Sequence, residues 1–268
     1  MRILGWIAIN GFRESVRDKV MYSLVAFAIL LIGTSYMLGQ LTAGQDLKIM
    51  KDLGLSSIAI FGLFMAVFIG IGLVSKEVER KSVYPLLAKP IRRADLVVGK
   101  YLGLVLTLVV NVTVMTVALY AVLAYVGWGE NDFARQAREA PALDPAMLKA
   151  VALTLVQLMI VTATAVFFST FSTPILSAAL TFGVYVAGYF STDLRNFDQV
   201  VNSRLAQTVA RALYYVLPNL SPFDVTAQVV HGLPVGWRYV AVTSAYGVVY
   251  IAILLVISAT IFSRRDFK

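Results

Sequence analysis

The stretch YLGLVLTLVVNVTVMTVALYAVLAYV, residues 101–126, decides the fold class of this chain. It holds 26 residues without a single Asp, Glu, Lys, Arg or His. A helix rises about 1.5 Å per residue and needs about 20 apolar residues to cross the hydrocarbon core of a bilayer. The stretch is long enough to span a membrane, and we expect it to be a transmembrane helix.

Five further uncharged stretches accompany it in the chain of 268 residues, at about 20–39, 56–74, 150–168, 175–191 and 239–262. Hydrophobic residues make up 59% of the chain and charged residues 14%, with a mean hydropathy of +0.79. In ordinary soluble domains about 45–50% of the residues are hydrophobic and about 25% are charged. We therefore predict an all-α integral membrane protein in which residues 1–268 form a single transmembrane domain of six helices.

The charges indicate how these helices are oriented. If the amino terminus is cytoplasmic, the segments 1–19, 75–100, 169–174 and 263–268 lie inside, and they contain 14 basic and 6 acidic residues. The outer segments contain 9 of each, so the net charge of +8 falls on the inner side, as the positive-inside rule predicts. We expect both termini to be cytoplasmic. Because the basic residues flank spans and accompany no soluble recognition module, they do not indicate nucleic-acid binding.

Two segments outside the spans have amphipathic patterns. In residues 1–19, Ile9, Phe12 and Val16 share one helix face, which predicts an interfacial helix before the first span. In the long outer segment 192–238, apolar residues spaced by four and three predict a second amphipathic helix, lying in the outer leaflet or re-entering the membrane before the last span. We expect the apolar stripe of this helix to close an outer gate through Leu205, Val209 and Leu213.

Residues 169–174 leave room only for a tight hairpin between the fourth and fifth spans. There Thr173 can cap the following helix with its side chain, and Pro174 fits the first helical turn. Aromatic residues near span ends are typical interfacial anchors, and they include Tyr22, Trp128, Trp237 and Tyr239.

The inner loop SKEVERKSVYPLLAKPIRRADLVVGK, residues 75–100, carries a short apolar strip between charged flanks. Val83, Leu86 and Leu87 form the strip, and Pro85 and Pro90 limit any helix. Such a loop can simply be attracted to anionic lipid. It can also form a short amphipathic helix that sits in a groove of a cytosolic partner. Composition alone leaves both interpretations open.

Several features together resemble the permeases of the ABC-2 type exporter family over nearly the full length. In that family the loop after the second span carries an acidic residue, Gly-Thr, an apolar pair, Pro, a basic residue and Gly-Lys. Residues at matching places here are Glu79, Ser82, Val83, Leu86, Leu87, Pro90, Arg92, Gly99 and Lys100. Lys81 and Ser82 stand where the family usually has Gly and Thr. The segment LPNLSPFD, residues 217–224, and the terminal run Arg264, Arg265 and Asp266 also resemble the family.

This resemblance implies the permease subunit of an ATP-driven exporter in a bacterial or archaeal cytoplasmic membrane. The inner loop would form a coupling helix seated on a separate ABC ATPase subunit, a P-loop NTPase. That subunit would bind ATP and Mg, and this chain would bind no cofactor directly. A second permease copy or a paralogue would complete a dimer in the lipid bilayer. The residues that the resemblance assigns to ATPase docking are Glu79, Arg80, Lys81, Val83, Tyr84, Leu86 and Leu87.

Polar side chains inside the spans are candidates for a substrate path. An alternative is hydrogen bonding between helices, worth on average about 0.6 kcal/mol per contact. Small residues at Gly62, Ala66 and Gly70, and again at Gly99 and Gly103, are spaced by four and predict close helix packing. The path candidates are Asn111, Thr154, Gln157, Thr181 and Tyr185.

Other classes of function fit the sequence less well. With no cysteine and a single histidine, thiolate and multi-histidine metal sites are excluded. The Gly-Lys pair at 99–100 lacks the upstream glycine of a phosphate-binding loop, so a nucleotide site is expected in another polypeptide. The uncharged spans lack the paired carboxylates of an intramembrane enzyme and the ionisable residues of ion-driven transport. A non-transporting membrane anchor or regulator of a cytosolic ATPase complex remains an alternative.

Overall fold

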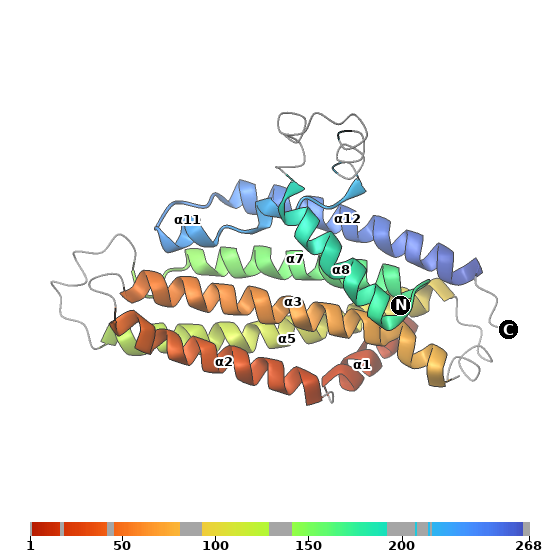
Figure 1. The fold of residues 1–268 in the computed structure, drawn as a ribbon, viewed down its shortest axis with the longest axis horizontal. Coiled ribbons are helices and arrows are strands. Elements are labelled where there is room, and N and C mark those ends of the chain that lie inside the picture. The colour runs from red at the N-terminus through yellow and green to blue at the C-terminus, as the bar shows by residue number, and fades with distance from the viewer. Residues whose placement is uncertain are drawn as a thin grey trace.

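The computed structural model describes residues 2–16, 19–41, 46–80, 93–128, 141–191, 207, 214 and 216–264. All regular elements over these residues are helices, which confirms the all-α prediction (Figure 1). In chain order they are α1 (Arg2–Val16), α2 (Lys19–Gln40), α3 (Asp46–Arg80), α5 (Arg93–Trp128), α7 (Ala146–Ser169), α8 (Pro174–Tyr189), the 3-10 helix η2 (Ser221–Phe223), α11 (Thr226–Val230) and α12 (Trp237–Arg264).

Five helices in this part of the chain are long and apolar enough to cross a membrane. The membrane-length segments are Lys19–Gln40, Asp46–Gly72, Asp95–Trp128, Ala146–Ser169 and Trp237–Ser263. The span predicted at 175–191 corresponds to α8, which has only 16 residues. At 1.5 Å per residue α8 is about 24 Å long, against a hydrocarbon core of about 30 Å. The described residues therefore hold five full-length spans and one short apolar helix rather than six equivalent spans.

The helix ends gather at the two ends of the bundle as the charge pattern requires. Figure 1 shows α1, the end of α3, the start of α5 and the end of α12 at one end of the molecule. At the opposite end α2 finishes and α3 begins, and α5 finishes and α7 begins. The described ends of the inner segments therefore share one end of the bundle, and the ends of α2 and α5 share the other end with the starts of α3 and α7.

Helix α3 is the centre of the bundle, and it packs against α2, α5, α7 and α8. Its contact with α7 depends on the predicted stripe of small residues. Gly62 faces the side chain of Leu158, Ala66 is fully buried, and a Cβ atom added at Gly70 would lie 2.5 Å from Cβ of Ala165. Because no larger side chain fits there, the two helices lie close together, and the packing prediction is confirmed.

Helix α1 is separate from α2 and lies across the start of α5. A Cβ atom added at Gly103 would lie 2.5 Å from the backbone oxygen of Ala8 and 3.1 Å from the backbone nitrogen of Phe12. The small residue at 103 thus allows the two backbones to touch. Ile9, placed by the sequence on the membrane-facing side, is 47% exposed, as an interfacial helix requires.

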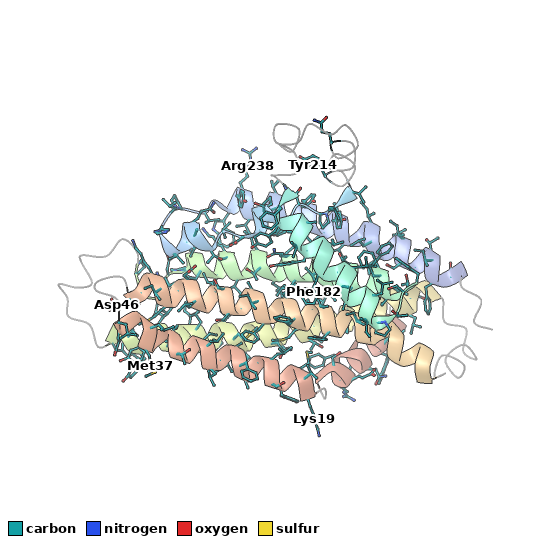
Figure 2. All side chains as sticks on the ribbon, viewed as in Figure 1. Lys19, Met37, Asp46, Phe182, Tyr214 and Arg238 are labelled. Carbon is teal, nitrogen blue, oxygen red and sulfur yellow. The ribbon has the colours of Figure 1, made fainter. Side chains whose placement is uncertain are left out.

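The turn between α7 and α8 is as tight as predicted, but it is stabilised differently. Thr173 occupies the N-cap position of α8 and Pro174 its first turn, yet the Thr173 side chain makes no capping hydrogen bond. Instead the hydroxyl groups of Ser172 and Ser177 lie 2.8 Å apart. From this turn α8 crosses α3 obliquely, with the Phe182 ring packed edge-on against Phe64 at 5.7 Å between centroids (Figure 2).

Candidate functional site

The loop predicted to dock an ATPase is flanked by the two longest described helices. Helix α3 has 35 residues and ends at Arg80, so Glu79 and Arg80 belong to its last turn. Helix α5 has 36 residues and begins at Arg93. The structure places these two helix ends at the same end of the bundle. The remaining docking residues, Lys81, Val83, Tyr84, Leu86 and Leu87, lie outside the described residues, as do the predicted gate residues Leu205, Val209 and Leu213.

The five candidate path residues are only partly brought together. Gln157 of α7 is buried, and it lies close to the hydroxyl of Tyr189 on α8. The ring of Tyr185 is 5.4 Å from that of Tyr189, so Gln157 and Tyr185 meet around a tyrosine that the sequence analysis did not single out. Thr154 is buried one turn before Gln157 on α7.

The other two path candidates have different surroundings. The Thr181 hydroxyl donates to the backbone oxygen of Ser177, 2.7 Å away in the same helix, which is the packing role expected of a buried threonine. Asn111 is half-buried on α5, and within the described ranges no hydrogen bond joins it to the other candidates. The structure therefore groups Thr154, Gln157 and Tyr185 but not Asn111.

A carboxylate completes this site. The Tyr189 hydroxyl donates to Oδ2 of Asp224 at 2.7 Å, while Oδ1 of Asp224 accepts a hydrogen bond from the Thr226 backbone N–H at 3.1 Å. We call Gln157, Tyr185, Tyr189 and Asp224 the α7–α8 polar cluster. Nε2 of Gln157 is buried and forms no hydrogen bond of standard geometry among the described residues, although it lies beside the Tyr189 hydroxyl. Leaving such a donor unsatisfied costs about 1–3 kcal/mol, so the cluster contains an amide that an acceptor on a ligand would satisfy.

The segment that carries Asp224 runs antiparallel along the first half of α12. The Tyr250 hydroxyl donates to the backbone oxygen of Val216 at 3.0 Å. The Asn219 backbone N–H donates to the Tyr246 hydroxyl oxygen at 2.9 Å, and the Tyr239 hydroxyl donates to the Pro222 oxygen at 2.7 Å. Because Tyr250 stands about halfway along the 28-residue helix, the segment reaches into the bundle from its end.

The same segment also contacts the end of α8. The Leu220 backbone N–H donates to the oxygen of Gly188 at 3.0 Å. A Cβ atom added at Gly188 would lie 2.6 Å from the backbone oxygen of Pro218, so the close approach of the two backbones requires glycine here. Phe223 is fully buried beside Gly247 of α12. Residues 216–224 are thus fixed between α8 and α12, and they bring the carboxylate to the cluster.

Nearly all of this architecture lies within one family match. A model of the family described as "ABC-2 family transporter protein" matches residues 5–267. The chain belongs to the ABC-2 transporter family. No curated protein matches the chain. Family membership confirms the resemblance drawn from the inner loop and from residues 217–224, and it identifies the chain as a membrane component of the ABC-2 transporter type.

In this ABC-2 protein, tyrosine hydroxyls stabilise residues 216–224, and the sequence carried a signal for them. Tyr239, Tyr246 and Tyr250 are spaced by seven and four residues, so they lie along one face of α12. Tyr185 and Tyr189 are spaced by four on α8. Tyr239 was predicted only as an interfacial anchor, but its hydroxyl also binds the segment. A repeated tyrosine at helical spacing within a span indicates a polar backbone segment packed against it.

A groove elsewhere in the ABC-2 fold has a different character from the polar cluster. A groove of about 610 Å³ lies between α5 and α7, and almost all of its lining is apolar. Its two threonines, Thr113 and Thr116, donate to backbone oxygens one turn earlier in their own helix, each at 2.7 Å. The groove therefore offers only apolar contacts, whereas the α7–α8 polar cluster offers amide, phenol and carboxylate groups.

Proposed function

We propose that this chain is the permease subunit of an ATP-driven exporter, which couples ATP hydrolysis in a separate ABC ATPase to substrate movement across a cytoplasmic membrane. The observation that carries the proposal is the arrangement of α3 and α5 in a chain that belongs to the ABC-2 family. These helices lead to and from the predicted docking loop at one end of the bundle. We take this end, with both termini, to be cytoplasmic because the segments there hold the excess of basic residues.

The lengths of these helices suit them to transmit motion. At 1.5 Å per residue α3 is about 52 Å long and α5 about 54 Å, so both extend well beyond the hydrocarbon core of about 30 Å. Neither sequence contains proline, the usual cause of a sharp kink. A displacement of the docking loop would therefore move α3 and α5 as rigid rods. Because α3 packs against α7 and α8, the displacement would reach the α7–α8 polar cluster.

The substrate would pass next to this cluster, between two permease copies. The unsatisfied amide of Gln157 would bind an acceptor on the substrate, and the Tyr185 and Tyr189 rings would provide contact area. Replacing Gln157 with Met, which has a similar volume, should preserve folding and ATPase binding but change the stimulation of ATP hydrolysis by substrate. If substrate stimulates ATP hydrolysis equally in a Gln157→Met variant, Gln157 does not contact the substrate.

A second permease copy is expected to cover the outward face of α8. Four large apolar side chains on this helix are more than one-third exposed, and they are Ile175, Leu176, Leu180 and Val186. Because the chain contains no cysteine, single cysteines report contacts without background. Val186→Cys should form a disulfide-linked dimer in membranes, whereas Val117→Cys, exposed in the groove between α5 and α7, should not. The reverse pattern would place the dimer contact on the other face.

The predicted outer gate can be tested by introducing charged side chains. Leu205→Asp together with Leu213→Asp would place carboxylates in the predicted apolar stripe. This double variant should impair transport, or uncouple ATP hydrolysis from it, while the ATPase stays bound. Unaltered transport and coupling would leave the stripe as a surface cover only.

The docking loop gives the decisive experiment. Leu86→Ala with Leu87→Ala should release the ATPase when the complex is purified in detergent, because a few buried apolar anchors usually dominate such interfaces. Lys81→Ala should weaken coupling more than binding. The matched control is Leu102→Ala with Leu106→Ala, which removes two exposed leucines of α5 inside the span.

Each outcome of this pull-down has a clear meaning. Equal membrane abundance of both double variants, with ATPase lost only from the loop variant, supports docking through 75–100. Full ATPase stoichiometry on the loop variant would show that the partner docks elsewhere. A bound ATPase whose hydrolysis drives no transport in vesicles would favour the alternative role of membrane anchor or regulator.

A further inference from the structure

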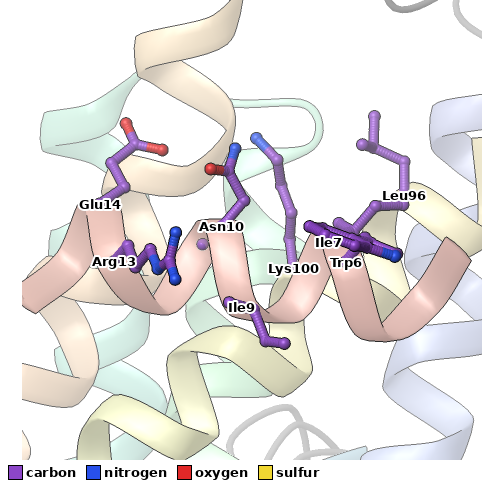
Figure 3. Close-up of a pocket in the computed structure, with 9 residues that line it drawn as sticks. Trp6, Ile7, Ile9, Asn10, Arg13, Glu14, Leu96 and Lys100 are labelled. Carbon is purple, nitrogen blue, oxygen red and sulfur yellow. The ribbon is translucent and has the colours of Figure 1, made fainter. Parts of the chain in front are cut away.

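A cavity separates helix α1 from the first turns of α5, at the end of the bundle that we take to be cytoplasmic. Its volume is about 340 Å³, within the range of about 300–1,000 Å³ that is usual for small-molecule sites. Figure 3 shows Asn10, Arg13, Glu14 and Lys100 around it, with Trp6 and Leu96 at one side. The α7–α8 polar cluster contributes no residue to the described lining of this cavity, whereas Leu96 and Lys100 belong to the part of segment 75–100 that forms the first turns of α5.

The charged groups of the cavity favour a single negative charge. Arg13 and Lys100 are cationic, and among the described residues of the lining Glu14 is the only carboxylate. Glu14 interacts electrostatically with Lys100, which leaves one positive charge in excess. The guanidinium of Arg13, the ammonium of Lys100 and the amide of Asn10 all donate hydrogen bonds. A phosphodiester matches this set because it carries one charge and several acceptor oxygens, and arginine binds phosphate in a bidentate manner.

The apolar part of the cavity places it at the surface of a bilayer. Trp6 is 75% exposed and Ile9 is 47% exposed on the same helix, whereas Leu96 of α5 is buried. Exposed tryptophan on an amphipathic helix is typical of the membrane interface, at the depth of the lipid headgroups. Basic pockets between helices on the cytoplasmic side are a known way for membrane proteins to bind anionic headgroups.

We propose that this cavity binds the headgroup phosphate of an anionic phospholipid. The lipid bridges α1 and α5. Its phosphate lies between Arg13 and Lys100, and the glycerol backbone that carries its acyl chains lies beside Trp6. The contact of Gly103 with α1 holds the two walls of the cavity together. This site does not depend on the proposed transport function, so it can be tested on the permease alone.

The experiment measures lipid binding by native mass spectrometry of the purified permease in detergent. The probes are dioleoylphosphatidylglycerol and dioleoylphosphatidylcholine, which share their acyl chains and differ in net charge. Because each basic residue near an anionic surface contributes about 1 kcal/mol, Arg13→Gln and Lys100→Gln should each weaken phosphatidylglycerol binding about fivefold. Glu14→Gln removes the competing carboxylate and should strengthen it. The matched control is Arg238→Gln, an exposed arginine at the opposite end of the bundle, which should have no effect.

Further measurements distinguish the effect of a lost charge from an effect on folding, and the binding of lipid from the binding of soluble phosphate. Lys100→Arg should restore the binding that Lys100→Gln loses, and thermal melting in phosphatidylcholine alone should be equal for all variants that are compared. Equal retention of both lipids, or phosphatidylglycerol binding that is unchanged in the double variant of Arg13 and Lys100, overturns the proposal. Displacement of the lipid by millimolar inorganic phosphate, with phosphate binding lost in the same variants, would also overturn it, by assigning the cavity to a soluble anion.

Discussion

Replacing Gly70 with alanine tests how closely α3 and α7 must approach. The new Cβ atom would lie 2.5 Å from Cβ of Ala165 and 3.2 Å from the backbone oxygen of Thr162. Non-bonded carbon atoms prefer about 3.5–4.0 Å, so the helices must separate locally by about 1 Å. Neither neighbouring atom is at the end of a flexible side chain, so the upper end of the usual overpacking cost, about 3 kcal/mol, applies. Alanine recovers about 1 kcal/mol through its better helix propensity. We therefore expect a net loss of about 2 kcal/mol.

Gly33 of α2 provides the matched control because nothing lies within 4 Å of a Cβ atom added there. Gly33→Ala should keep the gain of about 1 kcal/mol in helix propensity. The two substitutions are chemically the same, so a difference of about 3 kcal/mol between them reports packing alone. The assay is unfolding of the purified protein by titration with SDS, followed by tryptophan fluorescence. If Gly70→Ala is as stable as Gly33→Ala, the reasoning about this interface is wrong.

Three further predictions concern the polar contacts and the topology. Tyr189→Phe should cost about 1 kcal/mol of unfolding free energy, and a double-mutant cycle with Asp224→Ala, which removes the acceptor, should show coupling; strict additivity would mean that their hydrogen bond contributes nothing. Lys149→Met removes a 2.7 Å hydrogen bond to the oxygen of Val235 and a contact 4.9 Å from the centre of the Trp237 ring, so it should lower stability by about 1–2 kcal/mol in the same titration. In intact cells, a membrane-impermeant thiol reagent should label a cysteine introduced at Asn131 but not one at Ser82; the opposite labelling would invert the topology.

Helix type and helix packing could be predicted because each leaves a local pattern in the sequence, whereas the sidedness drawn from the charges stays a prediction. Uncharged runs of about 20 residues locate spans without any knowledge of contacts, and the spacing of Gly62, Ala66 and Gly70 identifies the face that meets α7. The length of α8 could not be predicted in this way. The stretch 175–191 is as apolar as a span, but the helix ends at Tyr189, where the backbone of residues 218–220 packs against it.

The residues of the candidate site likewise include some that the sequence could identify and others that it could not. Gln157 and Tyr185 could be named because polar residues are conspicuous in apolar helices. Asp224 was missed because it is distant in sequence, and only the antiparallel course of residues 216–224 along α12 brings it to Tyr189. Asn111 satisfies the same sequence criterion as Gln157, yet among the described residues no hydrogen bond joins it to the cluster. A polar residue within a span shows that a partner is needed, but its sequence position does not say which partner is near.

The contact between Lys51 and Pro141 sets an order for the biogenesis of the protein. Lys51 is 1% exposed, and its ammonium group donates to the Pro141 oxygen at 2.7 Å, across a separation of 90 residues. At about 5–20 residues per second, a ribosome needs roughly 5–20 s to add these residues. During that time the hairpin of α2 and α3 has been made, but this bond cannot form, so the end of α3 that holds Lys51 must stay hydrated or be held by the insertion machinery. The hairpin of α2 and α3 therefore reaches its final packing only after α5 has been inserted and residue 141 has emerged.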